Sequence, residues 1–382
     1  MRIGYCTITD PHNRRSWSGI HYFMMKAMEK HCGEVIPFGP LNNRLIFLGK
    51  IINKVTNLLL NKDFDYIRSP FITKEFARIL KKKISKHKCD ILFSPVGSQL
   101  LADLDTDLPI VYFSDTTFTL MLGYYASFSN LAGISKKWGI EADRRAIGKA
   151  DILLYSSKWA AESAIADYGA GRDRTHFIPM GANLEAIPSR DDIMSHRKKA
   201  HDILKILFVG VDWKRKGGDI VFQTMAELNR RGVDTELIVC GCIPPPEIKH
   251  ERLRVVGFLD KNDPGQASKL QNIYMDSSLF FMPTRNETAG IVFCESAAYG
   301  LPAISTLTGG VSTYVEDGIN GYLLPVESDF KDYADLIQKI WEDETKYIAL
   351  CESSRSKHES ELNWDSWGKR VAILMGNLVS KY

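Results

Sequence analysis

Short apolar runs alternate with segments of helical period along the whole chain, and this alternation constrains the fold more than any other feature. The runs predicted as strands are Ile3–Ile8, Glu34–Pro37, Tyr66–Arg68, Ile91–Ser94, Ile110–Phe113, Ile152–Tyr155, His176–Ile178, Ile206–Val209, Thr235–Cys240, Leu253–Val256, Leu279–Met282, Ala303–Ser305 and Gly321–Leu324. Helical segments lie between most of them. Such alternation is typical of parallel sheets with crossover helices, so the chain is predicted to be an α/β protein.

The length of the chain and a break in the pattern predict two domains. A chain of 382 residues is too long for one ordinary core. The stretch Gly181–His201 is rich in charged residues and has no apolar periodicity, so it is interpreted as a connector. We expect two doubly wound, Rossmann-like domains at 1–185 and 186–364. The last helix, 365–382, either packs back on the first domain or ends the second.

The composition is that of an ordinary soluble protein, with 45% hydrophobic and 25% charged residues. The seven cysteines are odd in number and irregularly spaced, which predicts free thiols in a reducing compartment such as the cytoplasm. We expect no signal peptide and no membrane-spanning segment. The net charge of +3 gives no reason to expect a nucleic-acid partner.

Positive charge is concentrated between Arg44 and Lys88, where twelve lysines and arginines stand against three acidic residues. Apolar residues recur there at helical spacing, from Phe47 to Leu59. One interpretation is a basic amphipathic helix that lies on an anionic membrane or receives a lipid-linked acceptor. The other is a helix that buries its apolar side in the core and leaves a solvated basic face. We favour the second interpretation and keep peripheral membrane association through 44–88 as the alternative.

Two carboxylates, Glu287 and Glu295, follow the predicted strand Leu279–Met282 with seven residues between them. Glycines stand between and after them, at Gly290 and in the pair Gly309-Gly310. A helix start offers free N–H groups to phosphate, and a carboxylate can accept hydrogen bonds from two adjacent hydroxyls. The stretch therefore suits a ligand that carries a diphosphate at one end and sugar hydroxyls at the other.

Arg215 and Lys216 follow another predicted strand, Ile206–Val209. In open parallel sheets ligands bind where strands end. Fixed cations at this place would stabilise the charge that builds on a departing diphosphate. The alternative is a solvated basic turn.

These motifs, with Gly300-Leu-Pro and Glu316-Asp-Gly-x-Asn-Gly321, resemble the donor half of retaining GT-B glycosyltransferases, most closely family 4. The resemblance covers residues 200–325 well and the first half in outline. It implies two Rossmann-like domains that face a cleft. It also implies transfer of a hexosyl unit from a UDP- or GDP-linked sugar to a glycan, lipid-linked or other hydroxyl acceptor, with no metal or other cofactor.

The resemblance also assigns roles. Glu295 would hold the ribose hydroxyls and Glu287 the donor sugar, while Lys216 and Arg215 would neutralise the diphosphate; Asp115 is the fourth predicted catalytic residue. The remaining predicted donor contacts are Gly19, Gly241, Phe258, Gly290, Ile291, Gly309 and Gly310.

Two positions depart from the family pattern. Val211 stands where the family has an arginine, and Ser114 stands where many relatives have a histidine. These departures favour, as one alternative, a nucleotide-sugar-binding protein without catalysis. The other alternative is a nucleotide-sugar isomerase on the same fold, which would need acid and base groups that the first half does not reveal.

Overall fold

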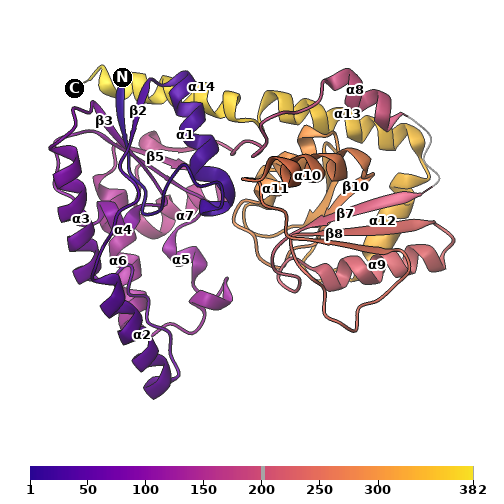
Figure 1. The fold of residues 1–382 in the computed structure, drawn as a ribbon, viewed down its shortest axis with the longest axis horizontal. Coiled ribbons are helices and arrows are strands. Elements are labelled where there is room, and N and C mark those ends of the chain that lie inside the picture. The colour runs from indigo at the N-terminus through magenta and orange to yellow at the C-terminus, as the bar shows by residue number, and fades with distance from the viewer. Residues whose placement is uncertain (199–202, 382) are drawn as a thin grey trace. The chain divides into compact units, whose positions relative to one another are not determined.

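The computed structural model describes residues 1–198 and 203–381, which divide into two compact units (Figure 1). Unit 1 comprises Met1–Pro179 and Trp367–Tyr382, and unit 2 comprises Met180–Ser366. The seven cysteines are free, as predicted. In the described part of the chain, no helix is both long and apolar enough to cross a membrane.

Unit 1 is built on a sheet of six parallel strands. Their order across the sheet is β2 (Glu34–Pro37), β1 (Arg2–Tyr5), β3 (Ile91–Pro95), β4 (Ile110–Ser114), β5 (Ile152–Tyr155) and β6 (Thr175–Phe177). Every residue of β3, β4 and β5 is buried. Strands covered on both faces need continuous apolar runs rather than alternation, which is why these runs are recognisable in the sequence.

Helices connect these strands. They are α1 (Ile20–His31), α2 (Ile46–Leu60), α3 (Pro70–Ile84), α4 (Ser98–Leu101), α5 (Phe118–Met121), α6 (Gly133–Lys149) and α7 (Lys158–Tyr168). The final helix, α14 (Trp364–Val379), contributes its residues from Trp367 onward to unit 1. The buried Trp367 ring packs edge-on against Phe93 and Phe113, with centroid distances of 6.0 Å, so α14 covers the middle strands of this sheet.

Unit 2 repeats the architecture with a second sheet of six parallel strands. Their order is β12 (Gly321–Leu324), β11 (Ala303–Thr306), β10 (Leu279–Met282), β7 (Leu204–Val209), β8 (Thr235–Cys240) and β9 (Leu253–Gly257). Its helices are α8 (Arg190–Arg197), α9 (Gly218–Arg230), α10 (Pro264–Asp276), α11 (Ile291–Ala298), α12 (Phe330–Trp341) and α13 (Glu344–Ser360).

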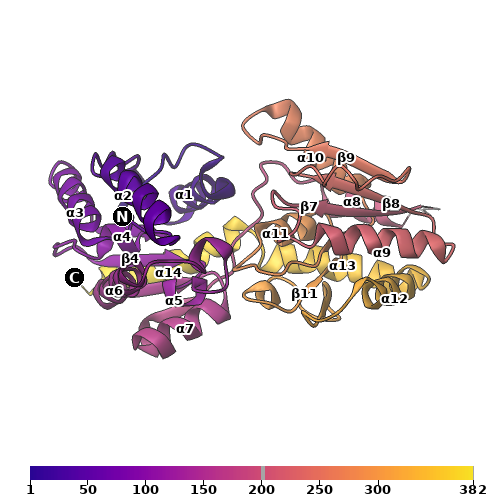
Figure 2. The ribbon, with the colours of Figure 1, turned by 90° about the horizontal axis from the view of Figure 1, so that it is seen from below.

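The strand order gives unit 2 a topological switch point between β7 and β10. The chain moves from β7 outward to β8 and β9, and then returns to place β10 on the other side of β7. Because such crossovers are right-handed, α9 and α10 must cover opposite faces of the sheet, as Figure 1 and Figure 2 show. Ligands of doubly wound sheets bind outside the carboxyl ends of the strands at this point. Lys216 follows β7 and Glu287 follows β10.

The predicted fold of two doubly wound parallel sheets is confirmed. Each of the twelve strands in the described residues overlaps a predicted run. The strand predicted at Tyr66–Arg68 is wrong, because turn chemistry prevails there. The Asp65 carboxylate accepts a hydrogen bond from the Ile67 N–H (3.1 Å), and Ser69 precedes Pro70 at the first position of α3.

The stretch predicted as a connector, Gly181–His201, contains the helix α8; its residues 199–201 lie outside the described residues. The Ser189 hydroxyl caps α8 by accepting from the Asp192 N–H, and Ile193 and Met194 are buried beneath it. The buried Arg197 guanidinium donates to backbone carbonyls, among them Tyr274 (3.0 Å) and Tyr299 (3.1 Å). These contacts attach α8 to unit 2.

For the basic segment we favoured a helix that buries its apolar side in the core. This interpretation is confirmed for α3 and is wrong for α2. The apolar residues of α3, including Phe76 and Leu80, are buried. Gly49 is the only buried residue of α2, whose apolar side chains are largely exposed. The physical reason, given below, is that α2 contacts its own unit through a small and polar side.

Candidate functional site

The turn between β7 and α9 places Lys216 at the switch point of unit 2. Gly217 caps α9 with φ of +80°, and a Cβ there would clash with the Pro283 carbonyl, which follows β10. Glycine adopts this left-handed conformation without steric cost. The close approach of the two backbones brings the residues after β7 against those after β10.

The loop after β10 is fastened to the same turn. The Arg285 N–H donates to the Arg215 carbonyl (2.8 Å), and the Arg215 guanidinium donates to the Asn286 carbonyl (3.0 Å). Gly290 ends the loop with φ of +87° and caps α11. The two predicted motifs are therefore parts of one structure, although about seventy residues separate them in the sequence.

A buried ion pair joins these motifs. The Lys216 ammonium contacts the Glu287 carboxylate, and the two side chains are about one-tenth exposed. The Arg215 Nη1 lies 4.0 Å from the same carboxylate. Two cations and one carboxylate thus lie together at the carboxyl ends of β7 and β10. Ligands of doubly wound sheets bind at this edge of the sheet.

The surroundings of Lys216 alter its protonation. Burial, with Arg215 acting in the same direction, lowers the pKa of Lys216 to about 7. The contacting Glu287 carboxylate favours the ammonium and acts against this shift. An anion that joined the group would favour the ammonium further, so ligand binding and protonation of Lys216 are coupled.

The paired glycines lie beside Glu287. The Gly310 N–H donates to the Glu287 carbonyl (3.1 Å), and Gly309 has a φ of +52°. Ile291 starts α11 next to Gly290 and is buried. Gly310 thus contacts the Glu287 backbone and Gly290 lies against the Glu287 side chain, while Gly309 and Ile291 adjoin these two glycines in the chain. The sequence predicted donor contacts at all four positions.

Glu295 lies about one turn into α11 and is 1% exposed. The Tyr274 hydroxyl of α10 donates to one of its oxygens (3.0 Å), and the Lys261 ammonium contacts the other. A carboxylate this deeply buried requires such partners. Both Lys261 and Tyr274 were missed by the sequence reasoning, since nothing in their local sequence points to an interaction with Glu295.

The ends of β8 and β9 complete this edge of the sheet. Gly241 has a φ of +100°, and its N–H donates to the Gly257 carbonyl (2.8 Å). Phe258 follows Gly257 and is 59% exposed. An exposed aromatic ring beside the Lys261 loop is a suitable surface for a flat base.

The remaining predicted residues lie in unit 1, each described within its own unit. Gly19 caps α1 with φ of +88° at the turn after β1. Asp115 follows the last residue of β4 and is half-buried. Ser114, which replaces the family histidine, donates through its hydroxyl to the Thr116 carbonyl (2.7 Å). Ser114 and Asp115 thus lie at the carboxyl end of β4, and Gly19 lies in the connection that follows the carboxyl end of β1.

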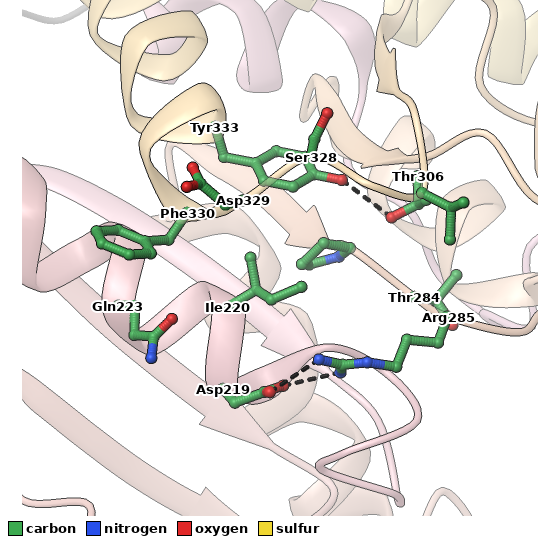
Figure 3. A pocket seen from close by; sticks show the side chains of 12 residues that line it. Asp219, Ile220, Gln223, Thr284, Arg285, Thr306, Ser328, Asp329, Phe330 and Tyr333 are labelled. Carbon is green, nitrogen blue, oxygen red and sulfur yellow. Dashed lines mark hydrogen bonds and ion pairs between the residues drawn. The ribbon is translucent and has the colours of Figure 1, made fainter.

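Unit 2 also contains a separate cavity of about 280 Å³ (Figure 3). The Asp219–Arg285 ion pair (2.8 Å) lies on one side, and the hydrogen bond between Thr306 and Tyr333 (3.0 Å) lies on the other. Lys216, Glu287 and Glu295 do not line this cavity. Over residues 1–198 and 203–381, no cluster of His, Cys, Asp and Glu side chains suits a metal ion.

Comparison with known proteins finds a family match in the second half of the chain. The family of glycosyl transferases group 1 matches residues 189–357. The D-inositol 3-phosphate glycosyltransferase of Corynebacterium aurimucosum is 27% identical over 255 residues, which are 62% of this chain and 59% of the relative. The chain thus spans less than two thirds of the length of this curated relative.

Solved structures extend the likeness to the whole chain. Sucrose-phosphate synthase of Thermosynechococcus elongatus superposes with a TM-score of 0.70 at 16% identity, covering 100% of this chain and 99% of that one. HepE of Anabaena, solved with UDP and glucose, gives a TM-score of 0.61 at 15% identity, with coverages of 98% and 99%. These likenesses establish the fold. The chain is therefore similar to the glycosyl transferases group 1 family over residues 189–357, and it has the two-domain fold of GT-B glycosyltransferases.

Proposed function

We propose that this chain is a retaining glycosyltransferase that moves a hexosyl unit from a UDP- or GDP-linked sugar to a hydroxyl acceptor. The observation that carries the proposal is the buried Lys216–Glu287 pair at the switch point, within the region that the family matches. HepE, which shares the fold, was solved with UDP-glucose. The curated relative acts, by its name, on D-inositol 3-phosphate.

The arrangement offers a separate group for each part of a donor. Lys216 and Arg215 supply positive charge for the diphosphate, close to the N–H groups that begin α11. Glu287 would accept hydrogen bonds from the hexose hydroxyls. Glu295 would take the ribose hydroxyls in exchange for Lys261. Gly241 and Phe258 would meet the base.

The reaction breaks the bond between the sugar C1 and the β-phosphate oxygen and forms a bond between C1 and the acceptor oxygen. The acceptor proton passes to the departing phosphate oxygen, so no side-chain base is required. Lys216 and Arg215 would stabilise the charge that develops on this oxygen, and such preorganised donors are worth ~10²–10³ in rate. Since these cations are fixed in the protein, we propose that catalysis requires no divalent metal. In unit 1, Asp115 remains a predicted catalytic residue and Gly19 a predicted donor contact.

The acceptor is proposed to be anionic or lipid-linked. The twelve basic residues between Arg44 and Lys88 belong to unit 1, and an anionic acceptor would be attracted to this unit. D-Inositol 3-phosphate, for which the curated relative is named, is a suitable first soluble acceptor because it carries a phosphate.

The test incubates the full chain with UDP- and GDP-hexoses, with and without acceptor, and follows the products by NMR. The proposal expects acceptor-dependent release of nucleoside diphosphate and a new glycoside with the anomeric configuration of the donor. Conversion of the donor without acceptor would identify an isomerase, and binding without turnover of any donor and acceptor pair would identify a binding protein. An inverted anomer would contradict retention. Loss of activity in excess chelator, restored by magnesium or manganese, would contradict metal independence.

A further inference from the structure

Helix α2 turns its apolar side outward. Its exposed apolar residues lie at helical spacing and are between 39% and 81% exposed: Phe47, Leu48, Ile51, Ile52, Val55, Leu58 and Leu59. Figure 1 shows α2 extending away from the sheet of unit 1. Isolated exposed apolar residues are common, but a contiguous apolar surface along one side of a helix marks an interaction site.

The opposite side of α2 is small and polar, and it is this side that contacts unit 1. Gly49 packs against the Tyr66 ring, which leaves no room for a side chain there. Asn53 accepts a hydrogen bond from the Phe64 N–H (2.7 Å), and Asn57 donates to the Asp63 carboxylate (3.1 Å). The orientation of α2 is thus fixed by specific contacts, and it holds the apolar stripe in water.

The neighbouring helix α3 shows the usual arrangement. Its apolar residues, such as Phe76 and Leu80, are buried, while Lys81 and Lys82 are exposed. Helix α3 thus contributes its apolar side chains to the core of unit 1, together with the strands and the other helices around the sheet. The apolar stripe of α2 is additional to that core.

The charges around the stripe have one sign. Between Arg44 and Lys62 there are four basic residues and no acidic one. At 100° per residue, Lys50 and Lys54 fall along one border of the stripe, and both are exposed. An apolar face bordered by lysines is typical of helices that lie in the plane of a membrane interface.

We propose that α2 is a membrane-docking helix, which inserts its apolar stripe at the headgroup boundary of an anionic lipid bilayer while Lys50 and Lys54 contact lipid phosphates. The charge complementarity selects the partner: a surface that is both apolar and negatively charged fits this helix, whereas an uncharged apolar partner leaves its lysines unused. Helix α3 takes no part in the insertion, because its apolar side is occupied by the core. The proposal does not depend on the transferase reaction.

The test measures co-sedimentation of the full chain with vesicles of phosphatidylcholine containing about one third phosphatidylglycerol, without any sugar substrate. Leu58→Asp should reduce the partition coefficient by at least about tenfold, since Leu58 would lose its burial in lipid. Leu58 is 81% exposed, so this change should not unfold the protein, which circular dichroism verifies. The matched control is Ile373→Asp, which changes an exposed apolar residue of α14. This variant should bind vesicles as the wild type does.

Two further variants separate the contributions. Lys50→Gln combined with Lys54→Gln should weaken binding at low salt by about fivefold for each lysine and little at high salt. Phe47→Trp should report insertion through a blue-shifted emission that brominated lipids quench. Wild-type protein that ignores anionic vesicles at low salt would overturn the proposal. A Leu58→Asp variant that binds vesicles as well as the wild type would also overturn it. So would a wild-type protein that does not bind vesicles but forms a concentration-dependent dimer, if Leu58→Asp dissociates this dimer.

Discussion

Two positively charged regions of this protein differ in how their charge is held. At the ends of β7 and β10, Lys216 and Arg215 lie against Glu287 in a largely buried group fixed by backbone contacts. On α2, Lys50 and Lys54 stand exposed beside apolar side chains that are themselves largely exposed. The first region has desolvated charge, and the second has solvated charge next to solvated hydrophobic surface.

This difference predicts different behaviour. Electrostatic interactions are strong and little affected by salt where water is excluded, and they are weak and screened where it is not. The buried group suits recognition of one phosphate at a fixed position. The exposed helix suits a surface whose position is not fixed, such as a bilayer.

The largest effect is expected in the buried region. Lys216→Ala should lower kcat by ~10²–10³, or ~3–4 kcal/mol, because a cation directed at the leaving phosphate is lost. Lys214→Ala, an exposed lysine of the same turn, should leave kcat within about twofold. Steady-state kinetics at saturating donor measure both variants. A Lys216→Ala enzyme with undiminished turnover would remove Lys216 from the reaction.

Glu295 should affect binding rather than turnover. Glu295→Ala should weaken binding of free UDP or GDP by ~1–3 kcal/mol, the cost of lost charged hydrogen bonds. Glu251→Ala, at an exposed carboxylate of the same unit, serves as the control for calorimetry. Unchanged nucleotide affinity in the Glu295 variant would show that the ribose binds elsewhere.

The lowered pKa of Lys216 gives a pH dependence whose sign can be stated. Because burial lowers this pKa to about 7, the free protein loses this proton above that pH, whereas a bound diphosphate restores it. Nucleotide binding at pH 8 should therefore take up a proton, and affinity should fall by at most about tenfold, or ~1.4 kcal/mol, per pH unit above 7.

Calorimetry in buffers of different ionisation enthalpy detects this uptake. Lys216→Arg, whose guanidinium stays charged, should bind without it. The same shift predicts that Lys216 makes the folded state relatively more stable as pH rises from about 7 toward 10.5, since the unfolded chain then binds the extra proton. Equal proton uptake by the wild type and the arginine variant would assign the coupling to another group.

The smallest effect is expected on α2. Leu58→Ala should change the free energy of unfolding by less than ~0.5 kcal/mol, because the side chain is 81% exposed. Leu80→Ala on α3 is the buried counterpart and should cost much more. Urea denaturation in the absence of lipid compares them. A large loss for Leu58→Ala would mean that α2 packs against protein.

The strands could be predicted from the sequence because buried parallel strands consist of uninterrupted apolar residues, as in Leu279–Met282. It did not predict α8, which is eight residues long and buries few apolar side chains. Nor could it give the direction of α2, since periodicity defines an apolar stripe without saying what lies opposite it. That direction depends on Gly49 meeting Tyr66.

The candidate site likewise contains residues that the sequence predicts and residues that it does not. Lys216, Glu287 and Glu295 each stand in a local motif, so they were predicted individually. Lys261 is 34 residues from its partner Glu295 and reaches it through the packing of the β9–α10 loop against α11. Such a contact follows from tertiary structure and leaves no pattern in the nearby sequence.

A crystal structure of the full chain with UDP or GDP would show whether the nucleotide binds at the ends of β7 and β10. We predict diphosphate oxygens about 3 Å from the Lys216 ammonium and the Arg215 guanidinium, with ribose hydroxyls on Glu295 in place of Lys261. A nucleotide bound instead in the cavity beside the Asp219–Arg285 ion pair, with Lys216 still on Glu287 and Lys261 still on Glu295, would contradict it.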